Sequence, residues 1–340
     1  MGGPRRAATL FSGRPISLKI QDTNGEKMSI AHSLGNLLPS GLREKVKPKY
    51  HMMVEKNYLR NHQKGTIRKD GELNERYVTR SVLGKEVSVV CRSFREFRRF
   101  VRFGDEPKDV VFPWLCMIDD CETLYDIGCA NGHEGIFANT MHGCNVTFVD
   151  VFTPSIETIL KSVYLQSKTR GVSHEKFNVV CGGCGDEPSF GRTYLHQLPI
   201  PGSTNNSFDE LDAYCRGGRE HEPVLASQWM PQVTIDELHF THGLPAPTHV
   251  KMDIDGFETK AIRGAKRTIS ERLCKSWVVE ISPGGFEEII GTFEKAGYKV
   301  LDTFEHYPEI EDCIDYVFVR EEDFADYEQK LAAIRKRLFG

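Results

Sequence analysis

The sequence lacks any long hydrophobic run. No stretch approaches the roughly 18 consecutive apolar residues that a membrane-spanning helix needs. The opening residues, MGGPRRAATLFSGRP, contain arginines but no apolar core behind them, so we expect no secretory signal. They also fail the myristoylation pattern, because Arg6 stands where Ser or Thr is required. We therefore expect no membrane partner.

Paired cysteines are scarce as well. The ten cysteines are scattered along the chain, and several of them, such as Cys129 and Cys274, fall in or beside apolar segments. This distribution is typical of reduced thiols and predicts a cytoplasmic protein. Cys181 and Cys184 form one CxxC, but no second pair or histidine partner accompanies them, so the pattern does not favour a zinc site.

A strong excess of charge of either sign is also missing. The formal net charge is -4, with 27% charged and 39% hydrophobic residues, as in ordinary globular proteins. This balance argues against a protein built wholly for nucleic acid. The charge is uneven, because residues 1–70 are rich in Lys and Arg whereas residues 287–323 are acidic. The 340 residues suffice for one large domain with extensions, and they give no indication of the oligomeric state.

The pattern along the chain predicts four regions. Residues 1–75 look like a basic, loosely structured N-terminal extension, with one short helix near 29–38. Residues 76–120 form a helical prelude that includes SFREFRRFVRF, whose aromatic residues recur at mostly three-residue spacing. That helix either packs on the core or offers a basic and aromatic surface to an anionic substrate or RNA. Residues 321–340 form an amphipathic helix that docks on the core or on a partner.

The remaining region, 121–320, alternates apolar strands with helices, which predicts an α/β fold. We expect a Rossmann-like, mostly parallel seven-stranded sheet with helices on both faces and an antiparallel edge hairpin. The predicted strands are TLYDIG, VTFVDV, FNVVCGG, HVKMDI, SWVVEI, YKVLDT and DYVFVR. Residues 186–231 interrupt the alternation with Gly, Pro, Asn and Ser, and they lie where a substrate lid would cover the carboxyl edge of the sheet.

The first chemical signal is the glycine-rich turn DIGCANG, residues 126–132, between a strand and a helix. No GxGxxG is present, which excludes the usual dinucleotide fingerprint. An acidic residue that opens the turn suits a ligand with an amino acid end, because Asp126 can meet an ammonium group directly or through water.

Asp150 ends the next strand, where a carboxylate can accept hydrogen bonds from ribose hydroxyls. Adenosine with an amino acid tail indicates S-adenosylmethionine. The predicted cofactor-binding residues are Asp126, Gly128, Cys129, Ala130, Asn131, Gly132, Asp150, Val151, Gly182 and Gly183.

The second signal is KMDIDGFE, residues 251–258. Along a strand, Lys251 and Asp253 point to the same side, and Glu280 at the end of WVVEI would lie close by. Our candidate proton acceptors are Asp253 first and Glu280 second, with Lys251 as the orienting cation. A structural salt-bridge cluster is the alternative interpretation. Mg²⁺ on the carboxylates of Asp253, Asp255, Glu258 and Glu280 is allowed but not favoured.

These blocks resemble the FkbM family of methyltransferases. The matching segments are DIGCANG, Asp150, VTIDEL (residues 233–238), KMDIDGFE with the following Arg263-Gly264-Ala265, and VVEIS, all within residues 122–281. Asp150 and Asp255 stand where family members carry Glu. The resemblance implies a class I methyltransferase fold, S-adenosylmethionine as cofactor, and O-methylation of a sugar or natural-product hydroxyl.

Three alternatives stay open from the sequence. The first two are N-methylation of an amine and N-methylation of a nucleic acid, and the third is a non-catalytic binding protein on the same fold. The expected partner is a small-molecule or glycan acceptor, and nucleic acid is allowed but not favoured.

Overall fold

The computed structural model describes residues 65–204, 206–208, 223–306 and 313–340, together with Met53, Glu55, Lys56 and Leu59. The chain divides into two compact units, residues 1–58 and residues 59–340. The larger unit holds all the elements named below. The predicted helix near 29–38 lies outside the described residues. In the described ranges, no helix combines the length and the hydropathy that crossing a membrane requires.

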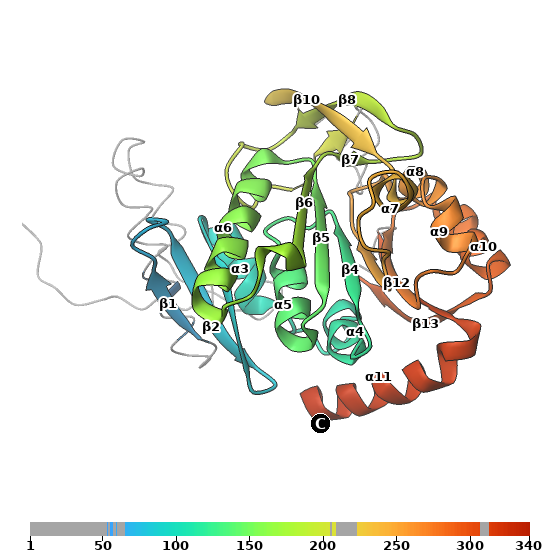
Figure 1. Ribbon diagram of the computed structural model, residues 1–340, viewed down its shortest axis with the longest axis horizontal. Coiled ribbons are helices and arrows are strands. Elements are labelled where there is room, and N and C mark those ends of the chain that lie inside the picture. Colours follow the sequence, from blue (N-terminus) through green and yellow to red (C-terminus); the bar gives the residue numbers. More distant parts are fainter. Residues whose placement is uncertain are drawn as a thin grey trace, which may run out of the picture. The chain divides into compact units, whose positions relative to one another are not determined.

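A seven-stranded sheet forms the centre of the larger unit (Figure 1). Its strand order is β13-β14-β12-β11-β4-β5-β6, and β14 alone among these seven strands runs antiparallel to its neighbours. The strands are β4 (Thr123–Ile127), β5 (Asn145–Asp150), β6 (Phe177–Cys181), β11 (His249–Met252), β12 (Ser276–Ile281), β13 (Tyr298–Glu305) and β14 (Ile314–Arg320). All seven predicted strands are present, and the antiparallel hairpin lies at the sheet edge as expected.

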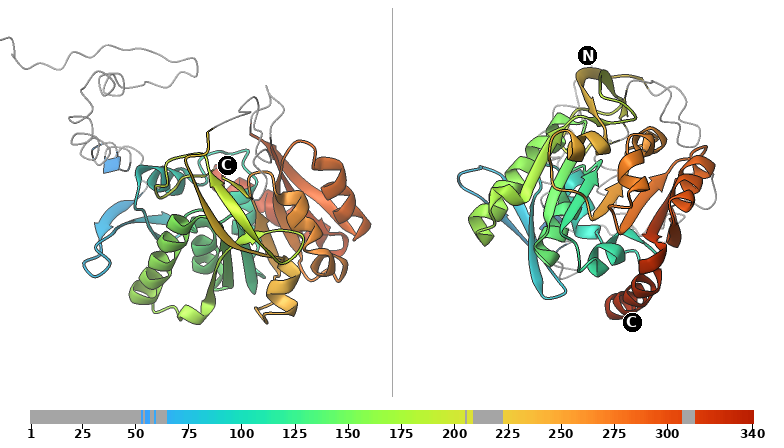
Figure 2. Two further views of the ribbon diagram at one scale, coloured as in Figure 1. Left: turned by 90° about the horizontal axis from the view of Figure 1, so that it is seen from above. Right: turned by 45° about the vertical axis from the view of Figure 1, so that its right-hand side comes forward.

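Helices cover both faces of this sheet (Figures 1 and 2). The chain runs outward from β4 to β6 and then returns to β11 on the other side of β4. Right-handed crossovers therefore place the helices of the two halves on opposite faces. The helices are α4 (Val111–Met117), α5 (His133–His142), α6 (Thr153–Arg170), α7 (Ile235–Phe240), α8 (Glu258–Arg263), α9 (Lys266–Ser270) and α10 (Phe286–Lys295). The predicted Rossmann-like α/β class is confirmed.

The prelude is not wholly helical. An antiparallel sheet of β1 (Thr66–Lys69), β2 (Arg76–Val82) and β3 (Lys85–Val90) precedes α3 (Phe94–Arg102), so the helical prediction is wrong for residues 76–90. Hydrophobic residues alternate with polar ones in this stretch, which is the period of a strand rather than of a helix. The sheet packs against α5 and α6, where Gln166 Nε2 donates to the Ser88 carbonyl at 2.7 Å.

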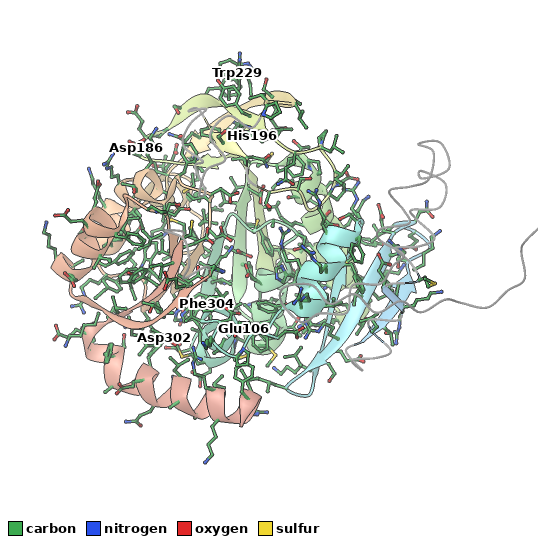
Figure 3. The ribbon with its side chains drawn as sticks, turned by 180° about the vertical axis from the view of Figure 1, so that it is seen from behind. Glu106, Asp186, His196, Trp229, Asp302 and Phe304 are labelled. Atoms are coloured by element: carbon green, nitrogen blue, oxygen red, sulfur yellow. The ribbon has the colours of Figure 1, made fainter. Side chains whose placement is uncertain are left out.

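The segment at 186–231 contains regular strands rather than irregular backbone. β8 (Ser189–Leu195), β9 (Ser207–Phe208) and β10 (Ala226–Val233) join β7 (Gly183–Cys184) in a second sheet of order β7-β10-β8-β9. Gly191 and Pro231 concealed these strands from the sequence pattern. Pro231 is tolerated because β10 begins to pair with β7 only at Gln232. Figure 3 labels Trp229 of β10 on this second sheet.

The predicted C-terminal helix is α11 (Phe324–Phe339), which follows the 3-10 turn Glu321–Asp323. Its predicted apolar face carries the buried residues Tyr327 and Leu331 and packs against α4. The Tyr327 hydroxyl donates to Asp120 at 3.0 Å. Docking on the core, one of the two alternatives for this helix, is therefore what the structure shows.

Candidate functional site

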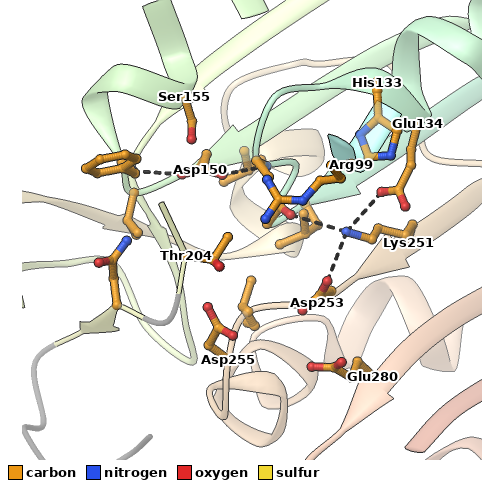
Figure 4. A pocket seen from close by; sticks show the side chains of 18 of the residues that line it. Arg99, His133, Glu134, Asp150, Ser155, Thr204, Lys251, Asp253, Asp255 and Glu280 are labelled. Atoms are coloured by element: carbon orange, nitrogen blue, oxygen red, sulfur yellow. Dashed lines mark hydrogen bonds and ion pairs between the residues drawn. The ribbon is translucent and has the colours of Figure 1, made fainter. Parts of the chain in front are cut away.

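A cavity of about 440 Å³ opens at the carboxyl ends of β4, β5 and β11 (Figure 4). These strands flank the point where the chain reverses its direction across the sheet, which is where doubly wound sheets bind ligands. The wall combines the turn after β4, the end of β5, α3, and four residues of the segment predicted to be a lid, namely Ser203, Thr204, Asn206 and Phe208.

The glycine-rich turn is pressed against the loop that follows β11. Gly128 has a left-handed φ of 73°, and a Cβ atom at this position would lie 1.8 Å from the Asp253 carbonyl oxygen. Gly132, the N-cap residue of α5, has a φ of 69°, and Ala130 is also left-handed with a φ of 49°. Glycine at position 128 is therefore required both by its φ and by the closeness of a second backbone.

Asp126 supports this turn from behind the cavity wall. Its carboxylate is fully buried, accepts a hydrogen bond from the Gly135 N–H at 3.1 Å, and lies 3.8 Å from Lys251 Nζ. Burial raises the pKa of Asp126 above its usual range, and the Lys251 charge opposes that rise. Asp126 does not line the cavity, so any contact with a ligand's ammonium group is indirect.

Asp150 ends β5 and faces the cavity with both carboxylate oxygens already oriented. One oxygen accepts from the Ala130 N–H at 2.8 Å, and the other accepts from the Phe152 N–H at 2.7 Å. Burial raises the pKa of Asp150 to about 6, although these two backbone bonds hold it lower than burial alone would. A carboxylate has about four acceptor positions, so this one can still accept hydrogen bonds from a bound ligand.

Lys251 lies within a cluster of carboxylates. Its Nζ donates to the Gly128 carbonyl at 3.2 Å and forms ion pairs with Glu134 at 3.2 Å and Asp253 at 3.7 Å. Burial alone would lower the pKa of Lys251, but the surrounding carboxylates outweigh it and keep the pKa well above its usual range. Lys251 is therefore a fixed positive charge. Asp253, with 44% of its side chain exposed, faces the cavity beside it.

The remaining acidic residues of this region have two different surroundings. Asp253, Asp255 and Glu280 line the cavity, and they bring one oxygen each to within 4.8 Å of one another. These are ligands of the kind that Mg²⁺ takes. Glu258 is buried instead, and its Oε1 accepts from the N–H groups of Ile254 and Gly256 at 3.1 Å each. Glu258 thus orders the loop after β11 and is not among the cavity's acidic residues.

The cavity contains part of the predicted residue set. All three predicted catalytic residues, Lys251, Asp253 and Glu280, line it. The predicted cofactor-binding residues that line it are Gly128, Ala130, Asp150, Val151, Gly182 and Gly183. The predicted residues that do not line it are Asp126, Cys129, Asn131 and Gly132. These four shape the turn or lie beneath it.

Several lining residues were missed by the sequence analysis, among them Arg99, Asp109, His133 and His306. Burial lowers the pKa of His133 to about 4, so this ring is neutral near pH 7. His306 lies 2.9 Å from Asp315 and 3.7 Å from Glu280. The basic and aromatic pattern of residues 93–103 was the available signal for Arg99. The rings of Phe97 and Phe100 are buried, so this helix packs on the core, as one of its two interpretations predicted, and Arg99 of the same helix lines the cavity.

Comparison with known proteins gives one family match. Residues 164–300 match the family model described as the methyltransferase FkbM domain, which confirms the predicted resemblance over that stretch. The match begins after the glycine-rich turn and Asp150, so those two features rest on the structure described above. None of the curated proteins matches the chain.

Several solved structures are similar to the chain at low identity. The methyltransferase FkbM from Methylobacillus flagellatus KT is 17% identical with a TM-score of 0.39, over 58% of this chain and 44% of that one. The chain thus spans less than half the length of that structure. Aeropyrum pernix fibrillarin, in complex with S-adenosyl-L-methionine, is 10% identical with a TM-score of 0.38, over 75% of this chain and 98% of that one.

Proposed function

We propose that this chain, an S-adenosylmethionine-dependent methyltransferase with an FkbM domain over residues 164–300, methylates a hydroxyl of a sugar or natural product. The observation that carries the proposal is the arrangement of carboxylates around the cavity. On one side of the cavity, two backbone hydrogen bonds orient the Asp150 carboxylate so that it can accept hydrogen bonds from a ribose. On the other side, Asp253 lies beside the protonated Lys251.

The cofactor would lie along the carboxyl ends of β4, β5 and β7. Asp150 accepts the ribose hydroxyls, and Gly182 and Gly183 let a flat base approach the backbone because they have no side chains. S-adenosylmethionine supplies a methyl group that is already activated. The protein's task is to align the acceptor oxygen with that methyl group and to exclude water.

Asp253 is our candidate for the group that takes the acceptor's proton. It faces the cavity, and the Lys251 ammonium group 3.7 Å away fixes the position of its carboxylate. The bound cofactor would supply the methyl group and would leave as the neutral thioether once its carbon–sulfur bond breaks, and an Asp253 oxygen would take the proton of the acceptor hydroxyl. Glu280 lies close enough to be the second candidate, since its carboxylate belongs to the same group of oxygens.

The charges around Asp253 support a neutral, hydroxyl-bearing acceptor. Carboxylates from several elements line this side of the cavity, namely Glu106, Asp109, Asp253, Asp255 and Glu280. Carboxylates accept hydrogen bonds from hydroxyl groups and repel phosphates. This excess of negative charge also favours an amine as a second candidate acceptor. A nucleic acid fits it less well, because its backbone is anionic.

Two measurements test the proposal. Calorimetry should show that the purified chain binds S-adenosylmethionine in the absence of any acceptor. Mass spectrometry of glycans, hydroxylated metabolites, amines and RNA incubated with the enzyme and cofactor should then show the mass gain of one methyl group on a hydroxylated compound. Transfer to RNA alone would contradict the acceptor assignment, and absence of cofactor binding would contradict the proposed activity itself.

A further inference from the structure

Helix α3 holds its residues in fixed positions beside the cavity. Phe97, Phe100 and Val101 are buried, and the ring of Phe103, just after the helix, meets that of His133 edge-on with centroids 4.9 Å apart. His133 is the first residue of α5. The helix is therefore packed against the start of α5 and the glycine-rich turn. A side chain that leaves α3 toward the cavity is placed by this packing.

Arg99 is that side chain. It lines the cavity, and its Nη1 is buried without a hydrogen-bond partner among the residues that the structure describes (Figure 4). A buried guanidinium N–H without an acceptor is costly, because it has lost water and gained nothing in exchange. Because Arg99 lines the cavity, its guanidinium group lies within reach of a ligand bound there. The expected ligand group is an anion with planar, paired oxygens, which matches the fork of a guanidinium.

The surroundings of Arg99 indicate which anion this is. Lys251, a buried cation of the cavity wall, is already engaged by Glu134 and Asp253. Arg99 lines the cavity together with His133, the first residue of α5, whose N-cap residue Gly132 offers no side-chain hydrogen bond. The N–H groups in the first turn of a helix favour negative charge as well, and Asp126 takes the one at Gly135. Two independent features thus attract an anion at the turn that we assign to the amino acid end of the cofactor.

We propose that Arg99 binds the α-carboxylate of S-adenosylmethionine, as a cofactor-binding residue supplied from outside the FkbM-matched segment. This inference rests on the proposed function. An anion of the acceptor is the rival occupant, but the acceptor side of the cavity is lined by carboxylates such as Asp253, Asp255 and Glu280. The carboxylate-binding group is therefore expected on the cofactor side, where Arg99 is.

The test compares two ligands that differ only in this carboxylate, S-adenosylmethionine and decarboxylated S-adenosylmethionine. Calorimetry on the full chain should show that the wild type prefers the former by about 10- to 100-fold, the scale of hydrogen bonds to a charged group. Arg99→Gln should remove this preference while leaving the affinity for the decarboxylated ligand unchanged. Arg99→Lys should retain part of it, since a single ammonium group keeps the charge but not the fork.

Arg98→Gln is the matched control, because Arg98 is the exposed neighbour on the same helix. It should leave both affinities unchanged, and the melting temperature of each variant checks that it is folded. Equal loss of affinity for both ligands in Arg99→Gln, or an unchanged preference, would overturn the assignment while the methyltransferase proposal stands. A wild type that binds neither ligand would overturn the methyltransferase proposal instead.

Discussion

Two buried carboxylates, Asp150 at the cavity and Glu258 in the loop beside it, accept hydrogen bonds from backbone N–H groups. Asp150 accepts two such bonds, and Glu258 accepts two on one oxygen. Burial raises the pKa of Asp150 to about 6 and that of Glu258 to about 7, against the lowering effect of these bonds. Both groups therefore change their protonation state close to neutral pH. Ordinary aspartate and glutamate side chains titrate two or more units lower.

The position of Asp150 predicts a pH dependence of cofactor binding. The folded-state pKa of Asp150, about 6, lies above the ordinary 3.8, so its carboxylate becomes a neutral carboxyl group as the pH falls through 6. A protonated carboxyl group has fewer acceptor positions for ribose hydroxyls, and we expect the affinity for S-adenosylmethionine to decline below pH 6. Calorimetry between pH 5 and 8 checks this.

Variants at Asp150 provide the controls for that titration. Asp150→Ala should weaken cofactor binding by about 1–3 kcal/mol at pH 7.5, the scale for lost hydrogen bonds to a charged group. Asp150→Asn should bind with a flatter pH profile, because it cannot titrate. A profile in Asp150→Asn that parallels the wild type would assign the pH effect to another group.

Asp253 should matter for turnover more than for cofactor binding. If it takes the acceptor's proton, Asp253→Asn should keep the affinity for S-adenosylmethionine yet lower the rate by about 10²–10⁴, the range for loss of a general base. A parallel Glu280→Gln variant shows which of the two carboxylates carries the larger effect. Near-wild-type turnover in Asp253→Asn would leave Glu280 as the better candidate. A chelator titration of the wild type separates this role from metal binding.

At the scale of elements, the contact between the turn after β4 and the loop after β11 constrains both. Gly128 and Gly143 have the same left-handed φ of 73°, but only Gly128 is crowded, by the Asp253 backbone. The two positions therefore separate the cost of a left-handed conformation from the cost of a close approach. Each end of the contact carries a residue of the proposed site.

We expect Gly143→Ala to cost about 1–2 kcal/mol in unfolding free energy, the penalty for a left-handed alanine. Gly128→Ala should cost about 1–3 kcal/mol more, because its Cβ forces the two backbones apart. Denaturant unfolding followed by circular dichroism measures both. Equal losses of unfolding free energy in Gly128→Ala and Gly143→Ala would show that the turn after β4 and the loop after β11 can move apart without cost.

The elements that could be predicted from sequence are those whose pattern is set by burial. β4, β11 and β12 are buried along their whole length, so each reads as an apolar segment. The strands β8 and β10 could not be predicted, because glycine and proline within them resemble loop composition. The β2–β3 hairpin was missed because the aromatic periodicity of α3 dominated the interpretation of that region.

The site was predictable where its residues end strands. Asp150 and Asp253 each follow an apolar strand, and parallel strands bring such ends together. Arg99 and His306 could not be located in this way. Arg99 comes from a helix before the sheet and His306 follows an edge strand, so only tertiary packing brings them to the cavity. Asp126, predicted to meet an ammonium group directly or through water, is fully buried and does not line the cavity.

At the scale of the whole molecule, residues 59–340 form one compact unit, and all the cavity-lining residues among those that the structure describes belong to it. We therefore expect that deletion of residues 1–58 leaves the affinity for S-adenosylmethionine unchanged. Calorimetry on the truncated chain checks this, with its melting temperature as the control. A truncated chain that fails to fold would show that the segment belongs to the fold.

The place of β4 inside the sheet, between β11 and β5, has a consequence for synthesis on the ribosome. β5 and β6 follow β4 closely, but its other neighbour, β11, ends only at Met252, after the whole second sheet has been made. Until then a nascent chain exposes one unpaired edge of β4, and such an edge invites association with other chains. The cavity is also incomplete in this intermediate, because Lys251 and Asp253 of its wall have not yet joined the sheet.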